Sequence, residues 1–201
     1  MSELSVGTLS GLAANSYVVD IASGSNLDLS NATDLPASAL PAGSIVDVKS
    51  VVKTDTFSSS LASGANATVT DLSITHALSN ASNKLLLIVS LGIVANSQNK
   101  ANTGVAVSDG TNLLQIGDAA SARIRVTATG RTPSTDAEAT LSHGLTVVHL
   151  PGDTSSRTYT VRAINVGGAT QTVYVNRSAE DSDFADRPRG ASSFVLMEVA
   201  G

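Results

Sequence analysis

Apolar and polar residues alternate with a period of two along most of this chain, and β-branched residues are frequent in the alternating segments. This pattern is typical of strands that bury one face and expose the other. No window sustains the i, i+3, i+4, i+7 apolar spacing over the roughly 11 residues that a confident helix prediction requires. The sequence therefore predicts an all-β chain. The expected strands are Tyr17–Ala22, Ile45–Lys53, Ala67–Thr75, Lys84–Val94, Gly104–Val107, Arg123–Thr129, Gly144–Leu150, Thr158–Val166, Thr170–Asn176 and Ser193–Val199.

Turn-forming clusters separate these strands, among them SDG at 108–110, PGD at 151–153 and GG at 167–168. Short strands with turn signals every 8 to 15 residues or so fit an antiparallel β-sandwich of the jelly-roll type. In such a fold each sheet covers one face of the other. We therefore expect residues 44–201 to form one β-sandwich domain.

The most apolar segment is KLLLIVSLGIVA, Lys84–Ala95. It is too short to cross a bilayer, which takes about 20 residues in a helix. We expect a central strand whose core-facing side chains are Leu85, Leu87, Val89, Leu91 and Ile93. The partner sheet covers that face, and the other face needs a second covering layer, for which a neighbouring subunit is the economical candidate.

The first 43 residues differ from the rest, because short apolar groups are separated by Ser, Gly and Asn and the segment closes on LPASALPAG. The two prolines of that closing stretch favour an extended path. We expect residues 1–43 to form an extended N-terminal arm for attachment or subunit exchange. Its expected interface residues are Val18, Val19, Ile21, Leu27, Leu29, Leu35 and Leu40.

Composition narrows the partners of this chain. Its net charge of -5 argues against a nucleic-acid partner, because phosphate binding needs clustered Lys and Arg. Without cysteine there is no disulfide or thiolate metal site. Neither a secretory signal nor a membrane-spanning segment is expected, so we predict a protein made in the host cytoplasm, with no membrane insertion.

The sequence contains few of the residue patterns that are typical of catalytic sites. Ser142 and His143 are adjacent, but neighbouring residues on a strand point to opposite faces and cannot form a nucleophile–base pair. No hydrolase elbow, zinc-protease helix or phosphate-binding loop occurs. Aromatic platforms for sugars are also scarce, since aromatic residues make up 3% of the chain. We expect a non-enzymatic protein with no cofactor.

The best metal candidate is the acidic loop that contains Glu180, Asp181, Asp183 and Asp186, because closely spaced carboxylates can collect Ca²⁺. Its spacing matches no EF-hand. Arg177, Arg187 and Arg189 flank these acids. An ion-pair network or a solvated loop is therefore the preferred interpretation, and calcium binding remains the alternative.

Five motifs together resemble a family of tailed-bacteriophage virion proteins, the tail-fibre or virion surface proteins. They are KTDTF at Lys53–Phe57, the apolar strand KLLLIVSLGIV, GDAASAR at Gly117–Arg123, VYVNRS at Val173–Ser178 and the terminal VLMEVAG. The resemblance covers about Val46–Gly201, and its motifs are structural rather than catalytic. It implies a β domain that forms a homotrimer on the virion surface, with N-terminal arms attached to the particle.

Three functional hypotheses follow. In the first, the protein is a structural surface module, such as a capsid decoration protein, head fibre or short tail appendage, whose partners are copies of itself and the major capsid protein or tail components. In the second, it is a tail-tip adhesin that recognises the host surface through loops such as Asn96–Asn102 or Thr132–Ala139. The third, a wall-degrading hydrolase, ranks last and would require turnover that depends on Asp181 or His143.

Overall fold

The computed structural model describes residues 40–97, 102–132 and 138–201, and the chain divides into two units, of which the second, Pro36–Gly201, contains all of these residues. The second unit is the one described below. The expected strand Tyr17–Ala22 and the expected interface residues Val18, Val19, Ile21, Leu27, Leu29 and Leu35 lie outside the described residues. Leu40 is described and is half-buried in a bend.

Within the described ranges the chain is all-β, as the alternating pattern predicts, and its strands form two antiparallel sheets. The six-stranded sheet, called sheet A, contains β1 (Ile45–Lys53), β2 (Phe57–Leu61), β4 (Lys84–Asn96), β8 (Leu141–His149), β10 (Gln171–Val175) and β11 (Ser192–Val199). The five-stranded sheet, called sheet B, contains β3 (Asn66–His76), β5 (Asn102–Ser108), β6 (Leu113–Leu114), β7 (Ala128–Arg131) and β9 (Arg157–Asn165).

Strand order gives the jelly-roll arrangement. In sheet A, β1 pairs with β11 and β2 pairs with β10, while both β10 and β11 pair with β4, which also pairs with β8. In sheet B the order is β3-β9-β5, and β6 and β7 both pair with β5. The chain crosses from one sheet to the other at the β2–β3, β3–β4, β4–β5, β7–β8, β8–β9 and β9–β10 connections. Such repeated crossing is typical of the double-sheet jelly roll.

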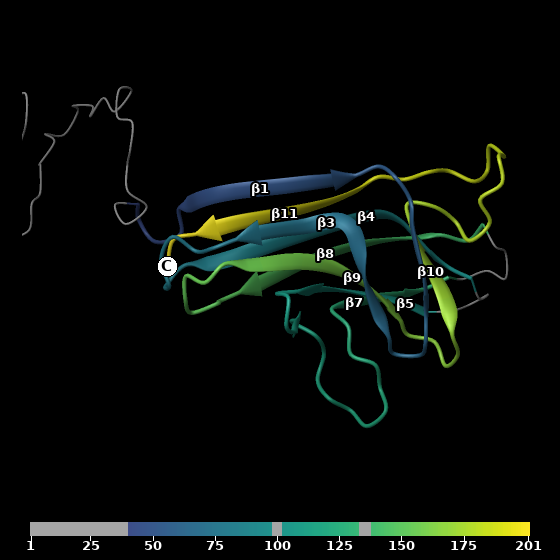
Figure 1. Ribbon diagram of the computed structural model, residues 1–201, viewed down its shortest axis with the longest axis horizontal. Coiled ribbons are helices and arrows are strands. Elements are labelled where there is room, and N and C mark those ends of the chain that lie inside the picture. Colours follow the sequence, from purple (N-terminus) through teal and green to yellow (C-terminus); the bar gives the residue numbers. More distant parts are fainter. Residues whose placement is uncertain (1–39, 98–101, 133–137) are drawn as a thin grey trace, which may run out of the picture. The chain divides into compact units, whose positions relative to one another are not determined.

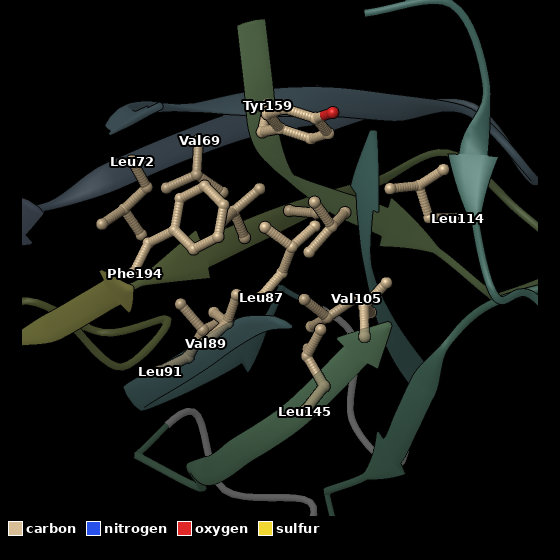
Figure 2. Close-up of a cluster of buried hydrophobic side chains, with 14 of the residues drawn as sticks. Val69, Leu72, Leu87, Val89, Leu91, Val105, Leu114, Leu145, Tyr159 and Phe194 are labelled. Atoms are coloured by element: carbon tan, nitrogen blue, oxygen red, sulfur yellow. The ribbon is translucent and has the colours of Figure 1, made fainter. Parts of the chain in front are cut away.

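The core lies between the two sheets and is built from alternate positions of their strands. Leu85, Leu87, Val89 and Leu91 of β4 are at most 1% exposed, which confirms the predicted inward face of this strand. Ile93 is buried as well, at 8% exposure. Figure 2 shows side chains from both sheets converging, with Phe194 at one side of the cluster and Tyr159 at another.

One expected strand, Arg123–Thr129, is largely wrong, because only its last two residues belong to β7. Its alternating Ile124 and Val126 instead lie in a loop over sheet B. A Cβ added to Gly104 would come within 2.4 Å of Val126 Cγ1, so the missing side chain of this glycine makes room for the loop. Figure 1 shows the loop between β6 and β7 projecting away from the strands. The short strands β2 and β6 were not predicted.

Strand directions separate two ends of the sandwich. The connections after β2, β4, β7 and β9 leave from one end, here called the loop end, and Figure 1 shows the long β10–β11 loop there too. The connections after β3, β5 and β8 leave from the other, here called the C-terminal end. At that end the N–H of Gly43 donates to Ala200 O at 2.8 Å, and the N–H of Ala200 donates to Ser44 O at 2.9 Å.

Candidate functional site

Ser142 and His143 do not form a catalytic pair. Ser142 is exposed and donates its hydroxyl to Gly92 O at 2.7 Å, whereas His143 is buried on the opposite face of β8. Burial lowers the pKa of His143, because a charged imidazole is disfavoured away from water. The alternation argument made from the sequence is thus matched by the geometry.

The acidic loop is tied to arginine side chains. Asp181 lies 2.7 Å from Arg189 Nη2 and 3.2 Å from Arg177 Nη1. Arg177 in turn stacks over the Tyr174 ring, with 4.7 Å from its central carbon to the ring centroid. These contacts occupy the carboxylate that a cation would need.

Arg187 makes the second half of this network. Its Nη2 lies 2.5 Å from Glu138 Oε1 and 3.3 Å from Glu180 Oε2, and its Nη1 lies 3.9 Å from Asp186. The pair with Glu138 joins the β10–β11 loop to the residues that precede β8. Among residues 40–97, 102–132 and 138–201 no group of three or more His, Cys, Asp or Glu side chains could hold a metal ion.

Replacing Asp181 with asparagine is expected to change the free energy of unfolding by less than about 1 kcal/mol, because ion pairs open to solvent contribute little. Added calcium is expected to leave the melting temperature unchanged. Thermal unfolding with and without CaCl₂ checks both points. A calcium-dependent rise in melting temperature that disappears in Asp181→Asn would establish a calcium site instead.

Two of the sequence motifs meet at a corner of sheet A. Asn176, from VYVNRS, is fully buried and donates from Nδ2 to Lys53 O at 2.9 Å and to Asp55 O at 3.0 Å, both in KTDTF. Its Oδ1 accepts a hydrogen bond of 2.6 Å from the Ser192 hydroxyl at the start of β11. Asn176 therefore fixes the ends of β1, β10 and β11 relative to one another.

Lys53 adds a buried cation to this corner. Its side chain is fully buried, and Nζ donates to Asp55 Oδ1 at 2.9 Å and to Thr70 Oγ1 at 3.1 Å. Asp71 Oδ2 lies 3.5 Å away, at a bulge of β3 where the φ of Asp71 is 64°. The hydrogen bond from Lys53 lowers the pKa of Asp55. This contact joins the β1 edge of sheet A to the β3 edge of sheet B.

A third buried polar cluster surrounds Glu198 of the terminal VLMEVAG. Oε1 accepts hydrogen bonds from Ser79 N at 2.8 Å, Ser79 Oγ at 2.7 Å and Asn83 Nδ2 at 2.6 Å. Oε2 lies 2.8 Å from His76 Nε2. Burial alone would raise the pKa of Glu198, but these hydrogen bonds outweigh it and lower the pKa. The cluster holds the β3–β4 loop against the last strand.

The outer face of sheet A is apolar and largely free of charge. Residues that pair across its strands share this face and form three cross-strand rows. The rows are Val48–Met197–Leu86–Val148, Ser50–Val195–Ile88–Thr146 and Val52–Ser193–Ser90–Gly144. Val48, Val52 and Val148 are 52%, 66% and 42% exposed. The twelve residues of these rows are here called the sheet A patch.

The outer face of sheet B, in contrast, is polar. Arg162 crosses from β9 to β3, where its Nε donates to Asn66 Oδ1 at 2.8 Å and its Nη1 contacts Thr68 Oγ1. Thr75 and Thr158 also share a hydrogen bond of 2.8 Å on this face. Sheet B thus presents hydroxyls, amides and a guanidinium to solvent, whereas sheet A presents hydrocarbon.

The motifs KTDTF, VYVNRS and VLMEVAG contain Lys53, Asn176 and Glu198, but the sequence alone predicted no role for these three residues. For two of them a signal was present. Lys53 keeps the period of Val51, and Glu198 keeps the period of Phe194, so both belong to inward-facing positions of their strands. A charged residue on an inward face is expected to be paired.

No protein-family model matches this chain, and no curated protein matches it. One solved structure that is similar is that of the infectious bursal disease virus Gx strain, with 14% sequence identity and a TM-score of 0.32. The match covers 77% of this chain and only 36% of the viral chain. A likeness this low establishes no common function. The resemblance of the five motifs to phage virion proteins therefore stays a prediction from the sequence.

In the part of the chain that the structure describes, no helix has the length and apolar character needed to cross a membrane.

Proposed function

We propose that this protein is a non-enzymatic structural protein of a bacteriophage virion. In this proposal it is a homotrimeric β-sandwich on the particle surface that decorates or stabilises the particle, as a capsid decoration protein, head fibre or short tail appendage. Its partners are copies of itself and the major capsid protein or tail components. Binding to the assembled particle and not to unfolded chains stabilises both partners by mass action.

The observation that carries the proposal is the role of the motif residues. Lys53, Asn176 and Glu198 come from three of the five virion-like motifs, and each is a buried residue whose hydrogen bonds join the end of a strand to another segment. Motifs that are used to fix a scaffold are expected in a structural protein. A hydrolase would instead gather such polar groups around an open cleft.

The sheet A patch adds independent support. A soluble monomer rarely exposes a contiguous apolar surface larger than a few hundred Å², and larger ones usually mark interaction sites. The patch extends over four strands of one sheet. A surface module that assembles with neighbours needs a surface of this kind.

Immunogold labelling of intact particles tests the proposed location. We expect label over the particle surface, spread over the head for a decoration role. Particles that carry no label, from a lysate that contains the protein, would contradict a virion role. Purified particles probed with pre-immune serum serve as the control.

Deleting residues 1–39 is expected to abolish binding to particles that lack the protein while leaving the sandwich folded. The deletion stops before the turn at Pro41–Ser44, so the hydrogen bonds of Gly43 and Ser44 with Ala200 are kept. Co-sedimentation with particles measures binding, and far-UV circular dichroism checks the fold. Undiminished binding by the shortened chain would remove the arm from the attachment mechanism.

A tail-tip adhesin is the second candidate. The connections after β4 and β7, which contain the two loops considered for host recognition, leave from the loop end. Leu40, by which the N-terminal segment joins the sandwich, precedes the turn bonded to Ala200 at the C-terminal end. The loop end therefore lies opposite the end at which the chain enters the sandwich, and in this candidate the loop end would face the host cell. Gold label confined to the tail tip would favour this candidate over decoration.

A further inference from the structure

We infer that the sheet A patch is a self-association surface and that its occupant is the same patch of a second copy of this chain. The inference goes beyond the proposed function, because a contact between two identical patches is two-fold and joins copies in pairs, separately from the three-fold contact of the proposed homotrimer. It does not depend on where in a virion the protein lies.

The patch has the chemistry of a buried face. Its twelve residues comprise eight apolar or glycine positions and four hydroxyl-bearing ones, with no charged residue. Lys84 lies at the boundary, opposite Val199 in the next pairing along β4. Interface centres are depleted of charge in the same way.

The patch reaches the free edge of sheet A. Within the described ranges β1 pairs only with β11, and Figure 1 shows these two strands side by side. Three of the most exposed large apolar residues, Ile45, Val48 and Val52, belong to β1. An exposed apolar edge strand promotes association unless something covers it.

The size of the patch fits contact between two sheets. The patch is four strands wide, at about 4.8 Å per strand, and three rows deep, at about 6.6 Å or two residues per row, so its projected face is roughly 20 by 20 Å, or on the order of 400 Å² per copy. Side-chain relief makes the accessible area larger than the projection. Two such faces together approach the 1,200 Å² or so at which specific interfaces begin.

Charge favours a copy of this chain as the occupant. A partner with an ordinary surface would bring Lys, Arg, Asp or Glu against a face that offers them no counter-charge, and burying an unpaired charge is strongly unfavourable. A second sheet A patch brings none. Because the same residues then serve on both copies, the contact is self-complementary.

A double substitution tests the surface. Val48→Lys with Val148→Lys places two charges at positions that are 52% and 42% exposed, so in a monomer both remain solvated and the fold is kept. Ser73→Lys, at an exposed position on the outer face of sheet B, is the matched control. We expect sedimentation equilibrium of the full chain at micromolar concentration to show association for the wild type and Ser73→Lys. The double variant is expected to associate more than about tenfold more weakly, a difference of about 1.4 kcal/mol or more.

Cross-linking identifies the occupant. The chain contains no cysteine, so Ser90→Cys places a single thiol on β4, one of the two inner strands of the patch, and Ser73→Cys places one on sheet B. With a short bifunctional maleimide we expect covalent dimers from Ser90→Cys and none from Ser73→Cys. Circular dichroism and thermal unfolding confirm that each variant is folded.

Several outcomes would overturn the inference. They are a wild-type chain that sediments as a 20.3 kDa monomer, equal association by the wild type and the double lysine variant, and dimers cross-linked through Ser73→Cys rather than Ser90→Cys. A monomer whose Ser90→Cys thiol resists maleimide would show that another segment of the chain covers the patch. Gold-labelled particles together with a homotrimer whose assembly does not depend on the patch would leave the proposed function intact and remove only this inference. Association that depends on the patch, together with particles that carry no label, would keep this inference and remove the proposed virion function.

Discussion

Replacing Glu198 with alanine is expected to lower the free energy of unfolding by about 3–5 kcal/mol, the usual cost of removing one partner from a buried charged cluster. The carboxylate is 1% exposed and accepts hydrogen bonds from Ser79 and Asn83. Alanine would leave these donors, and the facing His76, without their acceptor in a buried position. Urea denaturation followed by circular dichroism measures the loss.

The cluster around Glu198 also predicts that the free energy of unfolding depends on pH. The folded pKa of Glu198 lies below its value of 4.5 in an unfolded chain, so the folded state binds the proton less readily. The stability that the carboxylate supplies is therefore fully present above pH 4.5 and is lost as the pH falls through the lower, folded pKa. His76 and Asp47 are the other titratable groups in contact, with 3.6 Å between His76 Nδ1 and Asp47 Oδ2.

Glu198→Gln is the matched control, because it keeps the shape and one acceptor oxygen but cannot ionise. We expect a loss of about 1–2 kcal/mol at neutral pH, smaller than for alanine. The difference in stability between this variant and the wild type should narrow as the pH is lowered below 4.5. A difference that stays constant down to pH 2 would show that Glu198 does not carry the pH dependence.

Replacing Asn176 with alanine is the second substitution expected to be severe, at about 3–5 kcal/mol. The buried carbonyl of Lys53 and the part-buried carbonyl of Asp55 lose their donor, which costs about 1–3 kcal/mol for a fully buried group. The residue also has a φ of 63°, a left-handed conformation that asparagine tolerates and alanine adopts at a cost of about 1–2 kcal/mol.

Asn176→Gly separates the two causes, because glycine adopts the left-handed φ freely but makes none of the side-chain hydrogen bonds. We expect it to be more stable than Asn176→Ala by about 1 kcal/mol and still clearly less stable than the wild type. Chemical denaturation of the three chains in parallel gives the comparison. If both variants lose less than about 1 kcal/mol, the corner contributes little and the structural role of VYVNRS is wrong.

The sequence alone predicted the all-β class and much of the strand layout, because burial on one face of a sheet imposes a period of two. Strand β1 has the predicted bounds, and the inward residues of β4 are buried as expected. The alternation in Arg123–Thr129 misled, because a loop can also bury apolar residues: Val126 packs against Gly104 without belonging to a strand. The predicted interface residues of the arm from Val18 to Leu35 lie outside the described residues and stay predictions.

For the candidate sites too, the sequence predicted some features and missed others. Local spacing excluded a pair between Ser142 and His143, because neighbours on a strand face opposite ways. It did not reveal that Glu138, distant in sequence, reaches Arg187 beside the acidic loop, a contact that depends on how two loops are brought together. Nor could it show that Asn176 supplies the donors for Lys53 O and Asp55 O, since these groups are separated by more than a hundred residues.

Composition and periodicity thus determined that this chain forms strands, that Lys84–Ala95 is covered on one face, and that its motifs lack catalytic spacing. The tertiary structure decided which strands are neighbours. Only that pairing places Val48, Met197, Leu86 and Val148 in one row and leaves the outer face of sheet A apolar. The physical reason is that alternation is a local property of each strand, whereas a patch is formed by residues from strands that the fold brings together.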